Sequence, residues 1–303
     1  MFNKLIANIL PFMPKKLIWV FSKRYIAGET INDGIRVSKE FNSEKVVTTI
    51  DLLGEFIKNL NQAKINRDKY LEIIERFTDE NIQCNFSLKP TMFGLLINEE
   101  ICYNYIKEIV KKASARDNFV RIDMEDSQCV DSELILFRRL KNEFPKHVGL
   151  VFQSYLKRTL DDVKSLADLN SKENPINFRL CKGIYIEPAK IAFKDYEKVR
   201  QNFLEILEYM LINKMYAGVA THDKYLVEES YKLIEKHQVA GNMYEFQMLY
   251  GVTPELRKSI VEKEHLMRVY VPFGKEWFGY STRRLKENPK MASHIIKALF
   301  VRG

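Results

Sequence analysis

The chain has few cysteines, and none of them has the spacing of a metal site. The four cysteines stand far apart without a CxxC pair, and the five histidines form no HExxH motif. These absences argue against structural zinc and against a disulfide framework. We therefore expect no metal and a reduced compartment, the cytoplasm.

Glycine and proline are also scarce, with 12 and 9 residues among 303. Hydrophobic residues make up 46% of the chain and charged residues 29%, which excludes collagen-like and disordered classes. The longest apolar stretch, Leu5 to Phe21, is interrupted by two prolines and two lysines and has no small-residue cleavage site. It predicts neither a membrane-spanning helix nor a signal peptide.

The net charge of +8 is concentrated at the two ends of the chain. Residues 1–28 carry five basic side chains and no acidic one, and residues 257–303 carry eleven basic and four acidic ones. The middle is therefore acidic, with a net charge of −4. This distribution is unlike that of a nucleic-acid-binding surface, and we expect no nucleic acid as a partner.

Short apolar runs alternate with longer amphipathic stretches from residue 45 onward. The eight runs, each a predicted strand, are 46–53, 82–88, 119–124, 148–153, 177–181, 217–220, 243–248 and 267–271. The amphipathic stretches predict helices over 68–81, 98–116, 131–144, 187–214 and 223–238.

This alternation favours an α/β fold, a (β/α)8 TIM-like barrel, which needs about 250 residues. A doubly wound sheet is the alternative, but no GxGxxG follows the first run. We expect an N-terminal helical arm over residues 1–44, the barrel over residues 45–303, and a C-terminal helix over the barrel mouth.

Polar side chains stand at or near the ends of most predicted strands. Because the active site of a parallel barrel lies at these ends, we expect this set to meet at one mouth: Asp51, Glu55, Lys89, Asp123, Glu125, Gln153, Arg179, Lys182, Thr221, His222, Gln247 and Tyr270. Near the C-terminus, Arg283 and Arg284 form a tandem pair, and Glu287 follows four residues after the first of them. Two guanidinium groups suit bidentate binding of a small carboxylate, although a solvated basic face is the commoner fate of such a pair.

Several of these segments together resemble the motifs of the proline dehydrogenase family. They are IDLLGE (50–55), SLKPT (87–91), RLCKGIY (179–185), ATH (220–222), YEFQMLYG (244–251), RVYVPFG (268–274) and YSTRRLKENP (280–289). The resemblance covers roughly residues 25 to 300 in the family's order. It implies a distorted barrel that holds FAD, and the length implies the monofunctional form.

The resemblance implies that this protein oxidises L-proline to Δ1-pyrroline-5-carboxylate. It places Lys89, Arg283 and Arg284 on the substrate carboxylate, Glu287 on an arginine, and Tyr270 and Tyr280 against the ring, with Asp123 aiming an arginine. Arg179 would approach the flavin N5 edge. The FAD contacts it implies are Met124, Gln153, Arg179, Lys182, Gly183, Ile184, Thr221 and His222.

The chain departs from the family pattern at two positions. Ile184 stands where a small residue is frequent, and Asp223 stands where asparagine is common. The fit of the flavin is in question there, but the class of reaction is not.

The resemblance also implies a quinone as electron acceptor and a downstream pyrroline-5-carboxylate dehydrogenase as metabolic partner. The basic, apolar residues 1–22 either touch the inner face of a membrane peripherally or pack on the barrel. Two other functions stay open at this point: another flavin barrel oxidoreductase, similar to methylenetetrahydrofolate reductase, and a catalytically silent barrel that acts as a membrane or partner adaptor.

Overall fold

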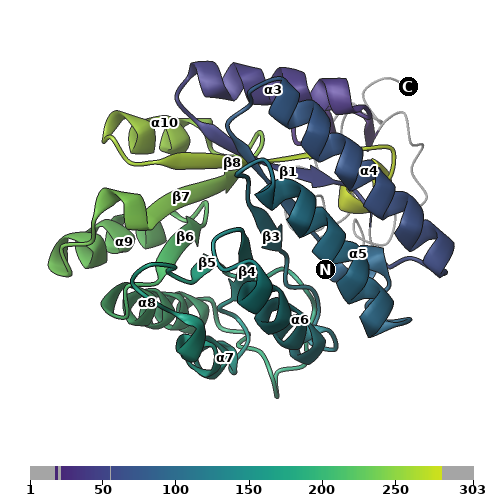
Figure 1. Cartoon of the computed structure of the whole chain (residues 1–303). Coiled ribbons are helices and arrows are strands. Elements are labelled where there is room, and N and C mark those ends of the chain that lie inside the picture. The colour runs from purple at the N-terminus through teal and green to yellow at the C-terminus, as the bar shows by residue number, and fades with distance from the viewer. Residues whose placement is uncertain (1–17, 20–21, 55, 282–303) are drawn as a thin grey trace, which may run out of the picture.

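The computed structural model describes residues 18–19, 22–54 and 56–281. In this part of the chain, eight parallel strands close into a barrel in sequence order, with β1 paired to β8 (Figure 1). The strands are β1 (Val47–Leu52), β2 (Cys84–Leu88), β3 (Val120–Ile122), β4 (Val148–Gln153), β5 (Asn177–Cys181), β6 (Tyr216–Ala220), β7 (Tyr244–Leu249) and β8 (Met267–Phe273). The eight predicted strands and the (β/α)8 class are confirmed.

Helices surround the barrel (Figure 1). They are α3 (Ile31–Ser43), α4 (Leu60–Asp79), α5 (Glu99–Ser114), α6 (Val130–Glu143), α7 (Thr159–Ser165), α8 (Tyr196–Ile212), α9 (Lys224–Lys236) and α10 (Pro254–Glu262). Three short 3-10 turns accompany them in the described residues: η2 (Pro90–Phe93), η3 (Ala167–Leu169) and η4 (Gly241–Met243). Asparagine or aspartate side chains cap α4, α5 and α8 by accepting from the third residue beyond each cap.

One predicted helix begins later than expected. The pattern predicted a helix over 187–214, but α8 begins at Tyr196. Pro188 cannot donate a backbone hydrogen bond, and the segment after it binds the loop that follows β4: Phe193 N donates to the Tyr155 carbonyl at 2.8 Å. These loop contacts replace the first turns of the predicted helix. The helices α7 and α10 were not predicted, whereas α3 lies within the predicted N-terminal helical arm.

Helix α3 covers the junction between the first and last strands (Figure 1). Thr30 and Asp33 form a capping box at its start, and Val37 and Phe41 are buried on its inner face. The segment before α3 also joins the barrel, since Ala27 N donates to the Pro272 carbonyl. The predicted boundary at residue 44 stays a prediction.

The interior of the barrel is polar, while the outward side chains of the strands are apolar and pack under the helices. Residues in register across the sheet share one face, and one such row reads Asp51, Ser87, Arg121 and Gly149. Hydrogen bonds between strands that are not neighbours, such as Arg179 Nε on β5 to Gln247 Oε1 on β7, identify this face as the inner one. The barrel therefore holds charged side chains in its centre.

The predictions for the two ends of the chain lie mostly outside the described residues. These include most of the N-terminal arm and the C-terminal helix beyond residue 281, although residues 277–281 are already helical. Across residues 18–19, 22–54 and 56–281, no helix combines the length and the apolar character needed to cross a membrane.

Candidate active site

A cavity of about 620 Å³ opens at the carboxyl ends of the strands. Twelve of the predicted site residues line it: Lys89, Asp123, Met124, Gln153, Arg179, Lys182, Gly183, Ile184, Thr221, His222, Tyr270 and Tyr280. Gln247 lines it as well, so nine of the twelve polar residues expected at one mouth line this cavity, whereas Asp51 and Glu125 are not among its lining residues. The roles assigned to the site residues stay predictions. Arg283, Arg284, Glu287 and Glu55 lie outside the described residues.

Asp123 is the centre of the polar network at the base of this cavity. Its Oδ1 accepts from Arg179 Nη1 at 2.8 Å and from the Ser87 hydroxyl, and its Oδ2 accepts from the Tyr270 hydroxyl at 2.8 Å. Burial works to raise the pKa of Asp123, but the charges of Arg179 and Lys89 outweigh it and hold the pKa below its usual value. Asp123 is therefore an ionised anchor for the groups around it.

Arg179 is fixed from three sides. Its Nε donates to Gln247 Oε1 at 2.8 Å, its Nη2 donates to the Ser87 hydroxyl at 3.2 Å, and its Nη1 binds Asp123. The guanidinium carbon also lies 5.1 Å from the centre of the Tyr270 ring. A side chain held this way keeps its charge at one place beside the cavity.

Lys89 lies next to Asp51 at the end of β2. Its Nζ stands 3.0 and 3.1 Å from the two carboxylate oxygens of Asp51, and 3.8 Å from Asp123 Oδ2. Burial raises the pKa of Asp51 to about 6, although the charge of Lys89 opposes the rise. The ionisation of Asp51 therefore changes close to neutral pH.

Two tyrosines stand on the same side of the cavity. The Tyr270 hydroxyl lies 3.4 Å from Lys89 Nζ, and burial, followed by the charges of Asp123 and Asp51, raises the pKa of Tyr270 well above its usual value. Tyr270 thus keeps its proton and donates it to Asp123. Tyr280 is buried and also lines the cavity.

Lys182 belongs to a second charged cluster at the rim of the cavity. Its Nζ lies 3.3 Å from Asp223 Oδ2 and 3.1 Å from the Tyr196 hydroxyl. Arg200 binds both oxygens of Asp223, at 2.9 and 2.8 Å. Hydrogen bonds from Arg200 and Tyr196 and the charge of Lys182 outweigh burial and lower the pKa of Asp223. The negative charge of Asp223 therefore pairs with two cations, Lys182 and Arg200.

Gly183 allows the loop after β5 to pass close to another loop. Its φ is +104°, and a Cβ atom there would lie 2.0 Å from Tyr155 Cδ1. No other residue type fits this position without a shift of the Tyr155 ring. The next residue, Ile184, lines the cavity with 46% of its surface exposed.

The other predicted cofactor residues are held by backbone contacts. Gln153 Nε2 donates to the Glu125 carbonyl at 2.8 Å, and Thr221 Oγ1 accepts from Asp223 N at 3.1 Å. His222 Nε2 accepts from Leu249 N at 2.9 Å, which places the ring proton of the neutral imidazole on Nδ1. Met124 is buried in the cavity wall.

Sequence reasoning gave no role to three residues on which this network depends. Ser87 and Gln247 hold Arg179, and Asp51 holds Lys89. Asp51 and Gln247 stood among the polar strand-end residues, and Ser87 stood inside a family motif, but only the closed barrel shows which side chains they meet.

A parallel eight-stranded barrel with a charged cavity at the carboxyl ends of its strands has the architecture of a (β/α)8 enzyme. A family model described as proline dehydrogenase matches residues 35–297. Proline dehydrogenase 1 of Bacillus subtilis subsp. natto is 34% identical over 278 residues, which cover 92% of this chain and 90% of that protein. Proline dehydrogenase of Deinococcus radiodurans is 33% identical over 291 residues, 95% of this chain and 92% of that protein.

Solved structures agree with the fold. Proline utilization A from Bdellovibrio bacteriovorus superposes with a TM-score of 0.87 at 25% identity, covering 95% of this chain but only 36% of that longer protein. Proline utilization A from Bradyrhizobium japonicum, at 20% identity, shares the fold with a TM-score of 0.77.

The chain belongs to the proline dehydrogenase family. It is an oxidoreductase of the flavoenzyme type, and its reaction is the oxidation of proline, the first step of proline catabolism.

Proposed function

We propose that this protein oxidises L-proline to Δ1-pyrroline-5-carboxylate in the cavity at the barrel mouth, with FAD as hydride acceptor. The observation that carries the proposal is that Lys89 and Arg179 approach different carboxylate oxygens of Asp123, Oδ2 and Oδ1 respectively. Lys89 would bind the carboxylate of the substrate, and Arg179 would stabilise the negative charge that develops on the cofactor.

The residues present fit FAD. The cavity of about 620 Å³ lies in the range of roughly 300–1,000 Å³ that is usual for ligand pockets. Its wall contains the apolar side chains of Met124, Val151, Met248 and Leu249 together with three cations, as a flat ring system with attached phosphates requires. When bound, FAD supplies the acceptor for the hydride that leaves the ring carbon next to nitrogen.

On the cofactor side, we assign Arg179 to the edge of the flavin that receives the hydride. The hydrogen bonds from Arg179 to Asp123 and Gln247 keep its charge in place, so no rearrangement is needed when negative charge develops. Lys182 suits a phosphate, and the Nδ1 proton of His222 suits a ribose or ring acceptor. We assign the remaining contacts to Met124, Gln153, Gly183, Ile184 and Thr221.

On the substrate side, we assign Lys89 to the proline carboxylate, together with Arg283 and Arg284 from the C-terminal segment and Glu287 as their orienting partner. Tyr270 and Tyr280 wall the ring. Asp123 is ionised and already accepts three hydrogen bonds, so its role is to position Arg179 and Tyr270 rather than to accept a proton. Fixed geometry of this kind is how a protein favours hydride transfer between two bound molecules.

We propose that the electrons pass from the cofactor to a quinone, which would bring the protein to the surface of a membrane. The product would pass to a pyrroline-5-carboxylate dehydrogenase.

The test is an anaerobic absorbance spectrum of the FAD-loaded protein before and after addition of L-proline. Bleaching of the flavin band with L-proline but not with D-proline is expected. A flavin that stays oxidised with both would refute the assignment of substrate, and failure to take up FAD would refute the assignment of cofactor.

A further inference from the structure

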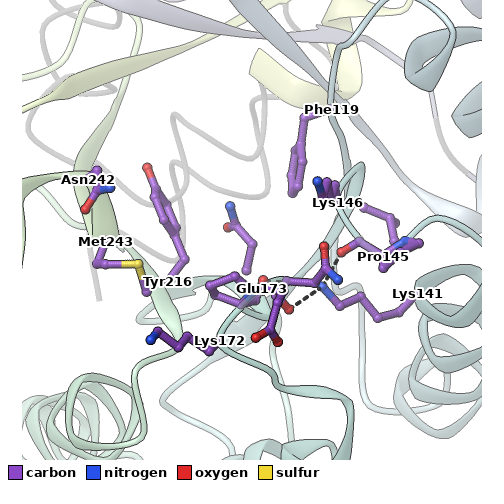
Figure 2. Close-up of a pocket in the computed structure, with 13 residues that line it drawn as sticks. Phe119, Lys141, Pro145, Lys146, Lys172, Glu173, Tyr216, Asn242 and Met243 are labelled. Atoms are coloured by element: carbon purple, nitrogen blue, oxygen red, sulfur yellow. Dashed lines mark hydrogen bonds between the residues drawn. The ribbon is translucent and has the colours of Figure 1, made fainter.

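A second cavity, of about 430 Å³, lies at the opposite end of the barrel (Figure 2). Val148, Asn177 and Tyr216, the first residues of β4, β5 and β6, line it. The mouth is lined by residues at the other ends of these strands. The two cavities are therefore separate, and nothing in the proposed reaction uses the second one.

The second cavity is lined by more positive than negative charge. Lys141, Lys146 and Lys172 line it, and Glu173 is the acidic residue that lines it (Figure 2). Within the described part of the chain, none of these three lysines has a carboxylate within ion-pair distance. The cavity is thus a concave surface with an unbalanced positive charge.

Lys141 is more than a surface lysine. The residue is 3% exposed, and its Nζ donates to the main-chain carbonyls of Pro145, Asn174 and Pro175. Burial lowers the pKa of Lys141 to about 8. A buried ammonium group whose partners are neutral carbonyls is stabilised by a nearby anion.

A second buried cation lies directly behind the cavity wall. Arg121 donates from Nη1 to the Asn177 carbonyl at 2.8 Å and from Nη2 to Asn177 Oδ1 at 2.6 Å, and its guanidinium carbon lies 4.9 Å from the centre of the Phe119 ring. Both Asn177 and Phe119 line the cavity. Burial, followed by the charge of Arg179, lowers the pKa of Arg121 to about 9.

One buried acceptor in the wall has no donor. Asn174 Oδ1 is buried and has no hydrogen-bond partner among the described residues, and Asn174 lines the cavity. An unsatisfied buried acceptor destabilises the protein, and a donor on a bound molecule removes that cost. The cavity therefore offers cations and one acceptor together.

We propose that this cavity binds a small oxyanion that also carries a hydrogen-bond donor. The oxyanion would lie against Lys146 and Lys172, with the charge of Lys141 beside it, and its donor would meet Asn174 Oδ1. Hydrogen phosphate meets both requirements, and so does a hydroxy acid. Sulfate, which has no proton at neutral pH, meets only the first.

The test is calorimetric titration of the FAD-loaded protein at pH 7 with inorganic phosphate, sulfate and glycolate, at constant ionic strength set with chloride. Saturable binding of phosphate or glycolate is expected to be at least tenfold tighter than that of sulfate. Phosphate alone would indicate a phosphorylated ligand, and glycolate alone a hydroxy acid. Equal binding of sulfate, or no binding beyond the chloride control, would overturn the proposal.

Substitutions in the cavity wall test whether the anion binds in this second cavity. The double variant K146A/K172A alters exposed side chains and is expected to weaken binding at least tenfold, while Asn174→Ala should abolish the preference over sulfate. The matched control, K232A/K258A, removes two exposed lysines on α9 and α10 and should bind as the parent does. An anion that binds at the mouth instead would persist in K146A/K172A and would contradict the assignment.

Discussion

Arg179 on β5 and Asp123, the residue directly after β3, form an ion pair inside the barrel, with 2.8 Å between Nη1 and Oδ1. The two strands are not neighbours, so the pair crosses the interior below the mouth. Both side chains are nearly buried, with 8% and 12% of their surfaces exposed. Loss of either charge leaves the other in a site with little access to water.

Replacing Asp123 by asparagine tests this pair. Asp123→Asn leaves Arg179 and Lys89 with one carboxylate fewer, and we expect the free energy of unfolding to fall by roughly 3 kcal/mol. We also expect kcat/KM for proline to fall at least about 100-fold, because Arg179 loses its orientation. Urea titration and steady-state kinetics measure the two effects. The control Asp131→Asn, at a largely exposed pair with Arg158, should change neither.

The pair of Asp51 and Lys89 predicts a pH dependence. The raised pKa of Asp51, about 6, means that the carboxyl is protonated below that pH and that Lys89 then loses the nearer of its two charged partners, Asp51 and Asp123. We expect KM for proline to rise as the pH falls through about 6. Asp51→Asn should show the high KM at every pH, so its KM should no longer change as the pH falls through about 6. If KM for proline in Asp51→Asn still rises as the pH falls through about 6, a group other than Asp51 causes the rise.

The same shift has a consequence for stability. Because the pKa of Asp51 is raised in the folded state, folding favours the protonated form, and its contribution to stability is lost as the pH rises from about 4 to 6. Asp51→Asn removes this contribution, so the pH dependence of its unfolding free energy should be flatter in this window. Denaturant titrations at pH 4, 5, 6 and 7 measure the difference, and parallel curves for the two proteins would contradict the expectation.

Lys182 provides a test of the cofactor side that does not depend on turnover. Lys182→Ala is expected to weaken FAD binding at least tenfold, because the rim cluster loses the cation that faces the cavity. Quenching of flavin fluorescence measures the affinity. Lys190→Ala, which removes an exposed lysine of the same loop, is the control. Equal losses in the two variants would mean that general positive charge, not the position of Lys182, attracts FAD.

Gly183 predicts a steric effect. Gly183→Ala places a Cβ against the Tyr155 ring at a backbone angle that alanine rarely adopts, and we expect a loss of roughly 1–3 kcal/mol in unfolding free energy. Gly241→Ala, where a Cβ meets nothing within 4 Å, should stay within about 0.5 kcal/mol of the parent. Equal unfolding midpoints for Gly183→Ala and the parent would contradict this account of the loop.

Much of the fold could be predicted because each strand is a short apolar run bounded by polar residues. The strand β4, Val148–Gln153, matches its prediction at both ends. The inner charges Arg121, Glu245 and Arg268 could not be predicted, because a charged residue within a run does not show whether it faces solvent or the barrel interior. Only closure of the sheet brings Arg268 Nε within 2.7 Å of Glu245 Oε1.

The sequence predicted which residues form the candidate site, but not which of these residues contact one another. The motifs identified Lys89, Asp123 and Arg179, since polar residues at parallel strand ends must meet. They did not reveal that Asp51 holds Lys89, because that contact depends on the register between β1 and β2 and on the direction of two side chains. Nor did they indicate the cavity at the other end of the barrel, whose residues come from strand starts, from α6 and from loops, with no motif among them.

The most direct measurement is a crystal structure of the FAD-loaded protein with a five-membered ring carboxylate that lacks the ring nitrogen and cannot be oxidised. The account predicts the flavin in the cavity at the mouth, with Arg179 beside the edge that receives the hydride and the carboxylate within hydrogen-bond distance of Lys89 Nζ. A carboxylate bound away from Lys89, or a flavin outside the mouth, would contradict it.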